Sequence, residues 1–233
     1  MVKLAISQSN YIPWKGYFDL IATADEFIVL DQVQFTKNDW RNRNKIITPN
    51  GPCWISIPVG KKISRRICDV ELLQPWQENH WNILQNNYSN SKYFEEIMRW
   101  LKPLYFEEKY QFLSQANIKF IEAVCFYLEI DTKITNSTDY SILAEGRTER
   151  LLSLCNQAGS NHYISGPTAK DYIDEDLFFR DGIEITWMDY SNYPKYNQLC
   201  DKFDHQVSIV DLLFNCGKDA INHFKNSYEV INS

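Results

Sequence analysis

The alternation of apolar and polar stretches in the first thirty residues predicts the opening of a parallel α/β sheet. Residues 2–7 and 27–30 are short apolar runs that end at polar residues, which is typical of buried strands. Between them, residues 16–24 carry apolar side chains at the spacing of one helix face. A strand, a helix and a strand in this order are the opening of a parallel α/β sheet.

The remaining chain predicts a β-hairpin and a helical insertion within the same α/β domain. Residues 45–59 are β-rich around an Asn-Gly turn, and a further strand is expected at 67–73. Helical spacing dominates from 76 to 128, so we expect a helical lobe at 76–130 inserted into a single α/β domain spanning 1–233. Later strands are expected at 132–135, 163–165 and 183–188, later helices at 147–158, 168–173 and 207–214, and a polar and aromatic loop at 189–206.

Composition narrows the class of protein and leaves one oddity, a high aromatic content. Aromatic residues make up 15% of the 233 residues, and the formal net charge is −6, which disfavours nucleic acid as the main partner. The six cysteines form no C-x-x-C pair, so neither structural zinc nor a disulfide framework is expected. Without a signal-peptide pattern or an apolar run of about 18 residues, we expect a cytoplasmic protein with no membrane span.

Polar and aromatic residues gather where the first two predicted strands end, in segments 8–17 and 31–44. Ligands of parallel sheets bind beyond the carboxyl ends of the strands, so both segments are expected to line one crevice. Gly16 would permit close approach to the helix amides, while Lys37, Arg41 and Arg43 could pair with a pyrophosphate. The expected substrate-binding residues are Gln8, Asn10, Tyr11, Trp14, Gly16, Tyr17, Lys37, Arg41, Asn42, Arg43, Ser165, Tyr196 and Gln198.

Two residues are the candidate proton acceptors. His80 opens an amphipathic helix and would titrate near working pH, and Asp31 follows the second predicted strand. The competing interpretation of His80 is a capping or surface histidine. The competing interpretation of the aromatic residues in segments 8–17 and 31–44 is that they pack in the core. No nucleophile elbow, Walker loop or metal-ligand set is present, so no metal site is expected.

Ordered motifs along nearly the whole chain resemble the WbqC-like protein family. They begin with Gln8-Ser9-Asn10-Tyr11-Ile12-Pro13-Trp14-Lys15-Gly16-Tyr17-Phe18 and continue with Asp31-Gln32-Val33-Gln34-Phe35, Arg41-Asn42-Arg43-Asn44-Lys45-Ile46, Pro49-Asn50-Gly51-Pro52, Ile57-Pro58-Val59, His80-Trp81, Tyr163-Ile164-Ser165-Gly166, Tyr196-Asn197-Gln198 and Ser208-Ile209-Val210-Asp211-Leu212-Leu213-Phe214-Asn215. Ser9 stands where the family usually has Pro, and Lys45 where Arg is usual.

That resemblance implies a role in bacterial O-antigen and other surface-polysaccharide synthesis. Some members accompany pathways that make glycyl-substituted amino sugars, so the implied activity is transfer of an acyl or aminoacyl group to the amine of a nucleotide-linked amino sugar. No cofactor is firmly implied, and an acyl or aminoacyl carrier-protein thioester could be the donor. An acyl carrier protein would then be a partner.

A looser similarity concerns the fold alone. The entry from the first strand through Asn10-Tyr11-Ile12-Pro13-Trp14-Lys15-Gly16-Tyr17 into a helix resembles the N-P-x-H-x-G-H entry of HIGH-type nucleotidyltransferases, which implies a Rossmann-like parallel sheet. Trp14 and Tyr17 replace both signature histidines. Two alternatives to acyl transfer therefore stay open: a non-catalytic subunit that binds a sugar nucleotide or carrier protein, and an enzyme similar to the nucleotidyltransferases.

Overall fold

The structure of the protein is a computed structural model that describes residues 2–62, 64–141 and 144–226. Its centre is a five-stranded sheet of β1 (Lys3–Ser7), β2 (Glu26–Val29), β5 (Lys133–Asn136), β6 (His162–Ser165) and β7 (Glu184–Trp187). All neighbouring strands are parallel, and their order is β5-β2-β1-β6-β7. Numbered by appearance within this sheet, the order is 3-2-1-4-5, that of a doubly wound fold. The predicted Rossmann-like α/β class is confirmed.

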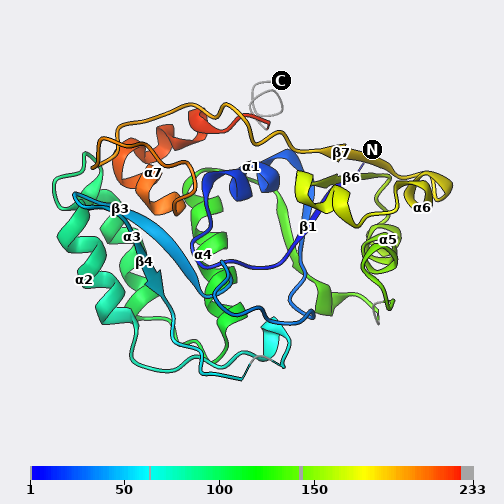
Figure 1. Ribbon diagram of the computed structural model, residues 1–233, viewed down its shortest axis with the longest axis horizontal. Helices are drawn as coiled ribbons and strands as arrows, with labels where there is room; N and C mark the ends of the chain where they lie inside the picture. Colours follow the sequence, from blue (N-terminus) through cyan, green and yellow to red (C-terminus); the bar gives the residue numbers. More distant parts are fainter. Residues whose placement is uncertain (1, 63, 142–143, 227–233) are drawn as a thin grey trace.

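Helices cover both faces of this sheet (Figure 1). Alternate side chains of β1 point to opposite faces, so Ala5 joins the core that contains α1 (Lys15–Thr23) and α4 (Leu113–Tyr127). Leu4 joins the second core beneath α5 (Arg147–Gln157) and α6 (Glu175–Arg180). The helices of the first two crossovers, α1 and α4, therefore lie on one face, and those of the last two, α5 and α6, lie on the other. The strand order reverses between β1 and β6.

An antiparallel hairpin stands apart from the main sheet. It consists of β3 (Arg43–Thr48) and β4 (Gly51–Ser56), as the Asn-Gly turn predicts, and Gly51 adopts φ +100° there. Beside it lie α2 (Gln77–Tyr88), α3 (Phe94–Phe106) and α7 (Ile209–Cys216), and the ring of Tyr88 stacks on that of Phe214 at 4.4 Å (Figure 1). These helices share one core with α1 and α4.

Two predicted elements differ from the structure. Residues 67–73 were expected to be a strand, but they begin with the 3₁₀ turn η1 (Ile67–Asp69), because the amides of Ile67 and Cys68 bond to Val33 and Asp31 in the loop after β2. Residues 168–173 were expected to be a helix and instead contain the 3₁₀ turn η3 (Pro167–Asp171). The short α6 that follows was not predicted.

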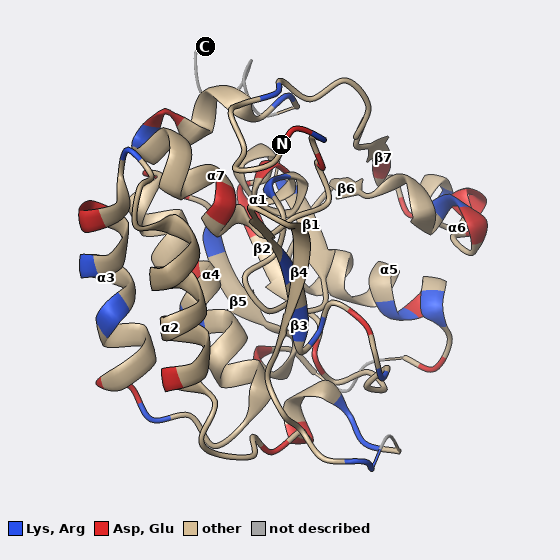
Figure 2. Cartoon of the chain, turned by 60° about the vertical axis from the view of Figure 1, so that its left-hand side comes forward, with Lys and Arg blue, Asp and Glu red and all other residues tan. Residues whose placement is uncertain are grey.

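Acidic and basic residues are mixed on the surface, as the modest net charge of −6 leads us to expect. Both signs occur on the outer helices α3 and α6 in the view of Figure 2. Within the part of the chain that the structure describes, no helix is long and apolar enough to cross a bilayer. The expected lobe at 76–130 contains α2, α3 and α4; α4 lies against the sheet, whereas α2 and α3 lie farther out (Figure 1).

Candidate functional site

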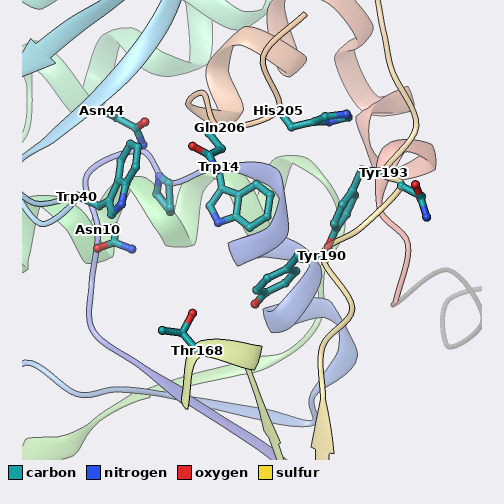
Figure 3. A pocket seen from close by; sticks show the side chains of 11 residues that line it. Asn10, Trp14, Trp40, Asn44, Thr168, Tyr190, Tyr193, His205 and Gln206 are labelled. Carbon is teal, nitrogen blue, oxygen red and sulfur yellow. The ribbon is translucent and has the colours of Figure 1, made fainter. Parts of the chain in front are cut away.

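A cavity of about 590 Å³ lies beyond the carboxyl ends of β1 and β6, where the strand order reverses (Figure 3). This is the position at which doubly wound sheets bind ligands. The lining residues come from four separate segments, namely Asn10, Pro13, Trp14, Trp40, Asn44, Thr168, Tyr190, Asn192, Tyr193, His205 and Gln206.

Aromatic rings form the walls of this cavity. Trp14, just before α1, makes edge contacts with Tyr190 at 5.0 Å and with Tyr193 at 5.8 Å, both from the loop after β7. Trp40 lines the opposite side, next to Asn10 and Asn44 (Figure 3). Rings fixed in this way offer apolar surfaces against which a ring-shaped polar ligand can lie.

Amide side chains supply most of the polar lining. Asn44 is held rigidly, because its Nδ2 donates to the carbonyls of Tyr11 at 3.1 Å and Ile12 at 2.8 Å while its Oδ1 accepts from the Lys45 amide. Asn10, Asn192 and Gln206 add further amides, and Thr168 adds a hydroxyl. The combination of aromatic faces with donor and acceptor groups suits a carbohydrate.

A buried guanidinium lies behind Asn10. The Nη1 and Nη2 atoms of Arg41 donate to Asn10 Oδ1 and Gln8 Oε1, and the nearest carboxylate oxygen, of Asp39, is 3.9 Å away. Nε has no hydrogen-bond partner. Burial lowers the pKa of Arg41, but a guanidinium stays protonated in proteins. The guanidinium of Arg41 therefore places a positive charge beside the cavity, and the amide oxygens of Asn10 and Gln8 hold it in position.

The backbone beside the cavity is strained at Ile12. This β-branched residue has φ +37°, a conformation that costs on the order of 1–3 kcal/mol and that tertiary contacts must hold. Its carbonyl accepts hydrogen bonds from Asn44 Nδ2 at 2.8 Å and from Ser208 Oγ at 2.7 Å. Such strain tends to occur at functional sites, where it positions neighbouring groups such as Pro13 and Trp14.

His205 is the histidine among the residues that line the cavity. Burial, followed by the charges of Lys15 and Lys195, lowers its pKa, so the ring is neutral at neutral pH. Its Nδ1 atom is buried without a hydrogen-bond partner. A neutral imidazole can accept a proton, so His205 is the histidine of the cavity with the chemistry of a general base.

Several residues predicted from the first strand end do lie together here. Asn10 and Trp14 line the cavity, while Gln8 and Arg41 bond to each other beside Asn10. Gly16 lies beneath the Trp14 ring, and the hydroxyl of Tyr17 donates to the carbonyl of Gln8 at 3.0 Å.

Other predicted binding residues lie outside the cavity. Lys37 is exposed, Asn42 donates to the carbonyl of Ile57, and Arg43 lies over the ring of Trp54 on the hairpin. Ser165 is buried at the end of β6 and accepts a hydrogen bond from Tyr163.

The predicted proton acceptors do not line this cavity. His80 is 1% exposed; its Nδ1 pairs with the Tyr11 hydroxyl at 2.9 Å and its Nε2 with the Ser56 carbonyl at 3.1 Å. Burial lowers the pKa of His80 to about 4. Asp31 accepts hydrogen bonds from Ser9 and Ser114, and it lines a smaller cavity of about 250 Å³ near the ends of β2 and β5.

Tyr196 and Gln198 belong to a buried cluster around Asp211. Their side chains donate to Asp211 Oδ2 at 2.7 Å and 3.0 Å, while the Tyr88 hydroxyl donates to Oδ1 at 2.7 Å. Burial raises the pKa of Asp211, against the opposing effect of these donors. The cluster fastens the loop at 189–206 to α7 and α2, and the expected contact of Tyr196 and Gln198 with a ligand stays a prediction.

The predicted site residues do not include those that the later loops bring to the cavity, namely Thr168, Tyr190, Tyr193, His205 and Gln206. One usable signal existed, because the loop at 189–206 is rich in polar and aromatic residues and follows the last strand of a parallel sheet, where ligand-binding loops occur.

Comparison with known proteins agrees with the sequence motifs. Residues 8–223 match the model of the WbqC-like protein family. The uncharacterized protein Rv1507c of Mycobacterium tuberculosis is 48% identical over 231 residues, which cover 97% of this chain and 98% of that relative. A search of the solved structures found no match. The chain therefore belongs to the WbqC-like protein family.

Proposed function

We propose that this protein is a cytoplasmic transferase of surface-polysaccharide synthesis that N-acylates an amino sugar carried on a nucleotide. An aminoacyl group such as glycyl is the proposed cargo. The observation that carries the proposal is the composition of the main cavity. Trp14, Trp40 and Tyr190 provide ring faces, while Asn10, Asn192 and Gln206 provide amides, which together fit a pyranose ring better than an apolar ligand.

The charges near the cavity support a phosphorylated sugar. Arg41 lies behind Asn10 and forms a long ion pair of 3.9 Å with Asp39, and a guanidinium attracts phosphate oxygens through charge-assisted hydrogen bonds. Arg43 adds a second guanidinium on the hairpin, over the ring of Trp54. In this proposal the sugar lies inside the cavity and its phosphates lie on the side of Arg41.

Acyl transfer to an amine requires a proton acceptor, and His205 is the residue we assign to it. The sugar nitrogen attacks the carbonyl carbon of a thioester, a C–N bond forms, the C–S bond breaks, and the sulfur leaves as a thiolate that takes up the proton His205 receives from the amine. The amine proton passes to the neutral imidazole of His205, which lines the cavity and whose Nδ1 carries no hydrogen bond. His80 and Asp31 are the alternative acceptors, but the hydrogen bonds described above occupy both imidazole nitrogens of His80 and both carboxylate oxygens of Asp31.

The proposal is tested by incubating the purified protein with amino-sugar nucleotides and a glycyl thioester of a carrier protein. Mass spectrometry should detect the N-glycylated sugar nucleotide, and His205→Gln should reduce its rate by about 10²-fold or more. Binding of the sugar nucleotide without a mass gain, for every acyl donor tried, would refute transferase activity and support a binding subunit instead. Release of pyrophosphate from a nucleoside triphosphate would favour nucleotidyl transfer.

A further inference from the structure

An aromatic and cationic surface continues outward from the wall of the main cavity. Trp40 lines the cavity, and its ring contacts that of Trp54 on β4, with the centroids 5.2 Å apart and the planes tilted by 36°. Trp54 is 44% exposed, although a tryptophan side chain is favoured in the interior. The indole surface therefore passes from the cavity to solvent without a break.

A guanidinium completes this surface. The Cζ atom of Arg43 lies 4.3 Å from the centroid of the Trp54 ring, the distance of a cation–π contact. Its Nη2 donates to the carbonyl of Asn38, which fixes the side chain, and its Nε has no partner. Among the ion pairs of the described residues, none involves Arg43.

The hairpin register explains why these two groups meet. Lys45 is paired with Trp54 and Arg43 with Ser56, so Arg43 and Trp54 are diagonal neighbours on one face of the two strands. Lys37 is exposed and precedes Asn38, whose carbonyl anchors Arg43. We name Trp40, Trp54, Arg43 and Lys37 the hairpin platform.

We infer that the hairpin platform binds the nucleoside diphosphate part of the ligand. The base stacks on the layer formed by Trp54 and Arg43, and the diphosphate lies between this layer and the cavity, within reach of Arg43 and Lys37. The sugar then enters the cavity past Trp40. This inference rests on the proposed function, since it assigns a place to the nucleotide of the same ligand.

The chemistry of the platform selects a nucleotide over an apolar partner. Bases stack on aromatic rings and on arginine planes without sequence preference, and guanidinium groups bind phosphate. A purely hydrophobic partner would leave the charges of Arg43 and Lys37 unpaired in the interface, which is unfavourable. The continuity of the surface through Trp40 also matches a single ligand whose sugar and base are joined by phosphates.

The test is to measure the affinity of the full-length protein for nucleoside diphosphates by calorimetry. Trp54→Ala should weaken binding of the preferred nucleoside diphosphate by about tenfold or more, and Trp54→Phe should restore most of it. Arg43→Gln should weaken it comparably. The affinity of the same variants for the amino sugar 1-phosphate, which lacks the base, should change less than about threefold.

A matched control lies elsewhere on the molecule. Tyr172 is 42% exposed and carries Arg147 over its ring at 5.5 Å, so Tyr172→Ala removes an equivalent pair and should leave nucleotide affinity unchanged. If Trp54→Ala and Arg43→Gln bind nucleotide as the wild type does, the platform is refuted even where the transferase is active. If they weaken nucleotide binding while no acyl transfer is found with any donor, the platform stands and the transferase proposal fails.

Discussion

The indole of Trp14 lies across Gly16, so closely that a Cβ atom on Gly16 would come within 2.3 Å of a ring carbon. The first turn of α1 therefore requires glycine at this position, because any larger residue would collide with the Trp14 side chain. The sequence suggested that Gly16 lets a ligand approach the helix amides. The structure adds a second requirement, because without a Cβ atom Gly16 leaves room for the Trp14 ring, which forms one wall of the cavity.

Gly16→Ala should therefore disturb the cavity and the fold together. The new methyl group pushes the Trp14 ring away from Tyr190 and Tyr193, which we expect to lower the free energy of unfolding by about 1–3 kcal/mol. Urea unfolding measures this change. Gly166→Ala is the control, because its φ is −69° and its Cβ would meet Tyr190 at an ordinary 3.4 Å. Equal stability losses for both variants would contradict the special role of Gly16.

We expect the buried ammonium group of Lys15 to lower the free energy of unfolding at neutral pH, although its contact with the loop at 189–206 supports the cavity. It is 3% exposed, donates to the Pro194 carbonyl at 2.8 Å and lies near the rings of Tyr193, Tyr196 and Phe203. Burial lowers its pKa from 10.5 to about 8, so between these values the unfolded chain binds a proton that the folded chain does not. The Lys15 contribution to stability thus rises with pH over that range.

Lys15→Met should raise the free energy of unfolding at pH 7 by about 1–2 kcal/mol and abolish this rise between pH 8 and 10. The same change should weaken ligand binding, because the Lys15 contact holds the loop at 189–206 against the cavity. Urea unfolding across pH, with the exposed Lys102→Met as a control, measures the effect. A less stable Lys15→Met variant with the pH slope of the wild type would contradict the argument.

The first half of the cavity could be predicted because it depends on local order. Asn10 and Trp14 follow a buried strand directly, and the carboxyl end of a central parallel strand is a ligand site whatever the remaining topology. Trp40 could be assigned to the same crevice for this reason. These inferences need only the alternation of strand and helix, which the periodicity of hydrophobic residues along the sequence predicts.

The second half depends on contacts between distant segments. The loop that carries Tyr190 and His205 has no periodicity, and its position is fixed by the bonds of Tyr196 and Gln198 to Asp211 on α7. The burial of His80 likewise depends on Tyr11, which is 69 positions away in the sequence. A histidine at the start of an amphipathic helix has the same sequence pattern whether solvent or a tyrosine faces it.

His80 should make the fold sensitive to acid. Burial lowers its pKa from 6.5 to about 4, so between these values protons bind to the unfolded chain first. The free energy of unfolding should therefore fall as the pH decreases from about 6.5 to 4, with a contribution from His80 of roughly 3 kcal/mol. His80→Gln should flatten this part of the stability curve.

Tyr11→Phe is the matched control for that experiment. It removes the hydroxyl that pairs with His80 Nδ1 but leaves the imidazole buried, so stability should drop by about 1 kcal/mol with the acid dependence retained. Chemical denaturation at pH 7 and at pH 4.5 distinguishes the two variants. An unchanged acid dependence in His80→Gln would show that other groups determine it.

Tyr196→Phe should separate a structural role from a ligand contact. Its hydroxyl donates to the buried Asp211 carboxylate, so its loss should lower the free energy of unfolding by about 1–2 kcal/mol and leave the affinity for a sugar nucleotide within about twofold. Tyr88→Phe removes the donor to the other carboxylate oxygen of Asp211 and should behave alike, because Tyr88 lies outside the cavity. A tenfold loss of affinity in Tyr196→Phe alone, with stability unchanged, would instead place its hydroxyl against the sugar, because a bond made only to the ligand leaves the unfolding equilibrium untouched.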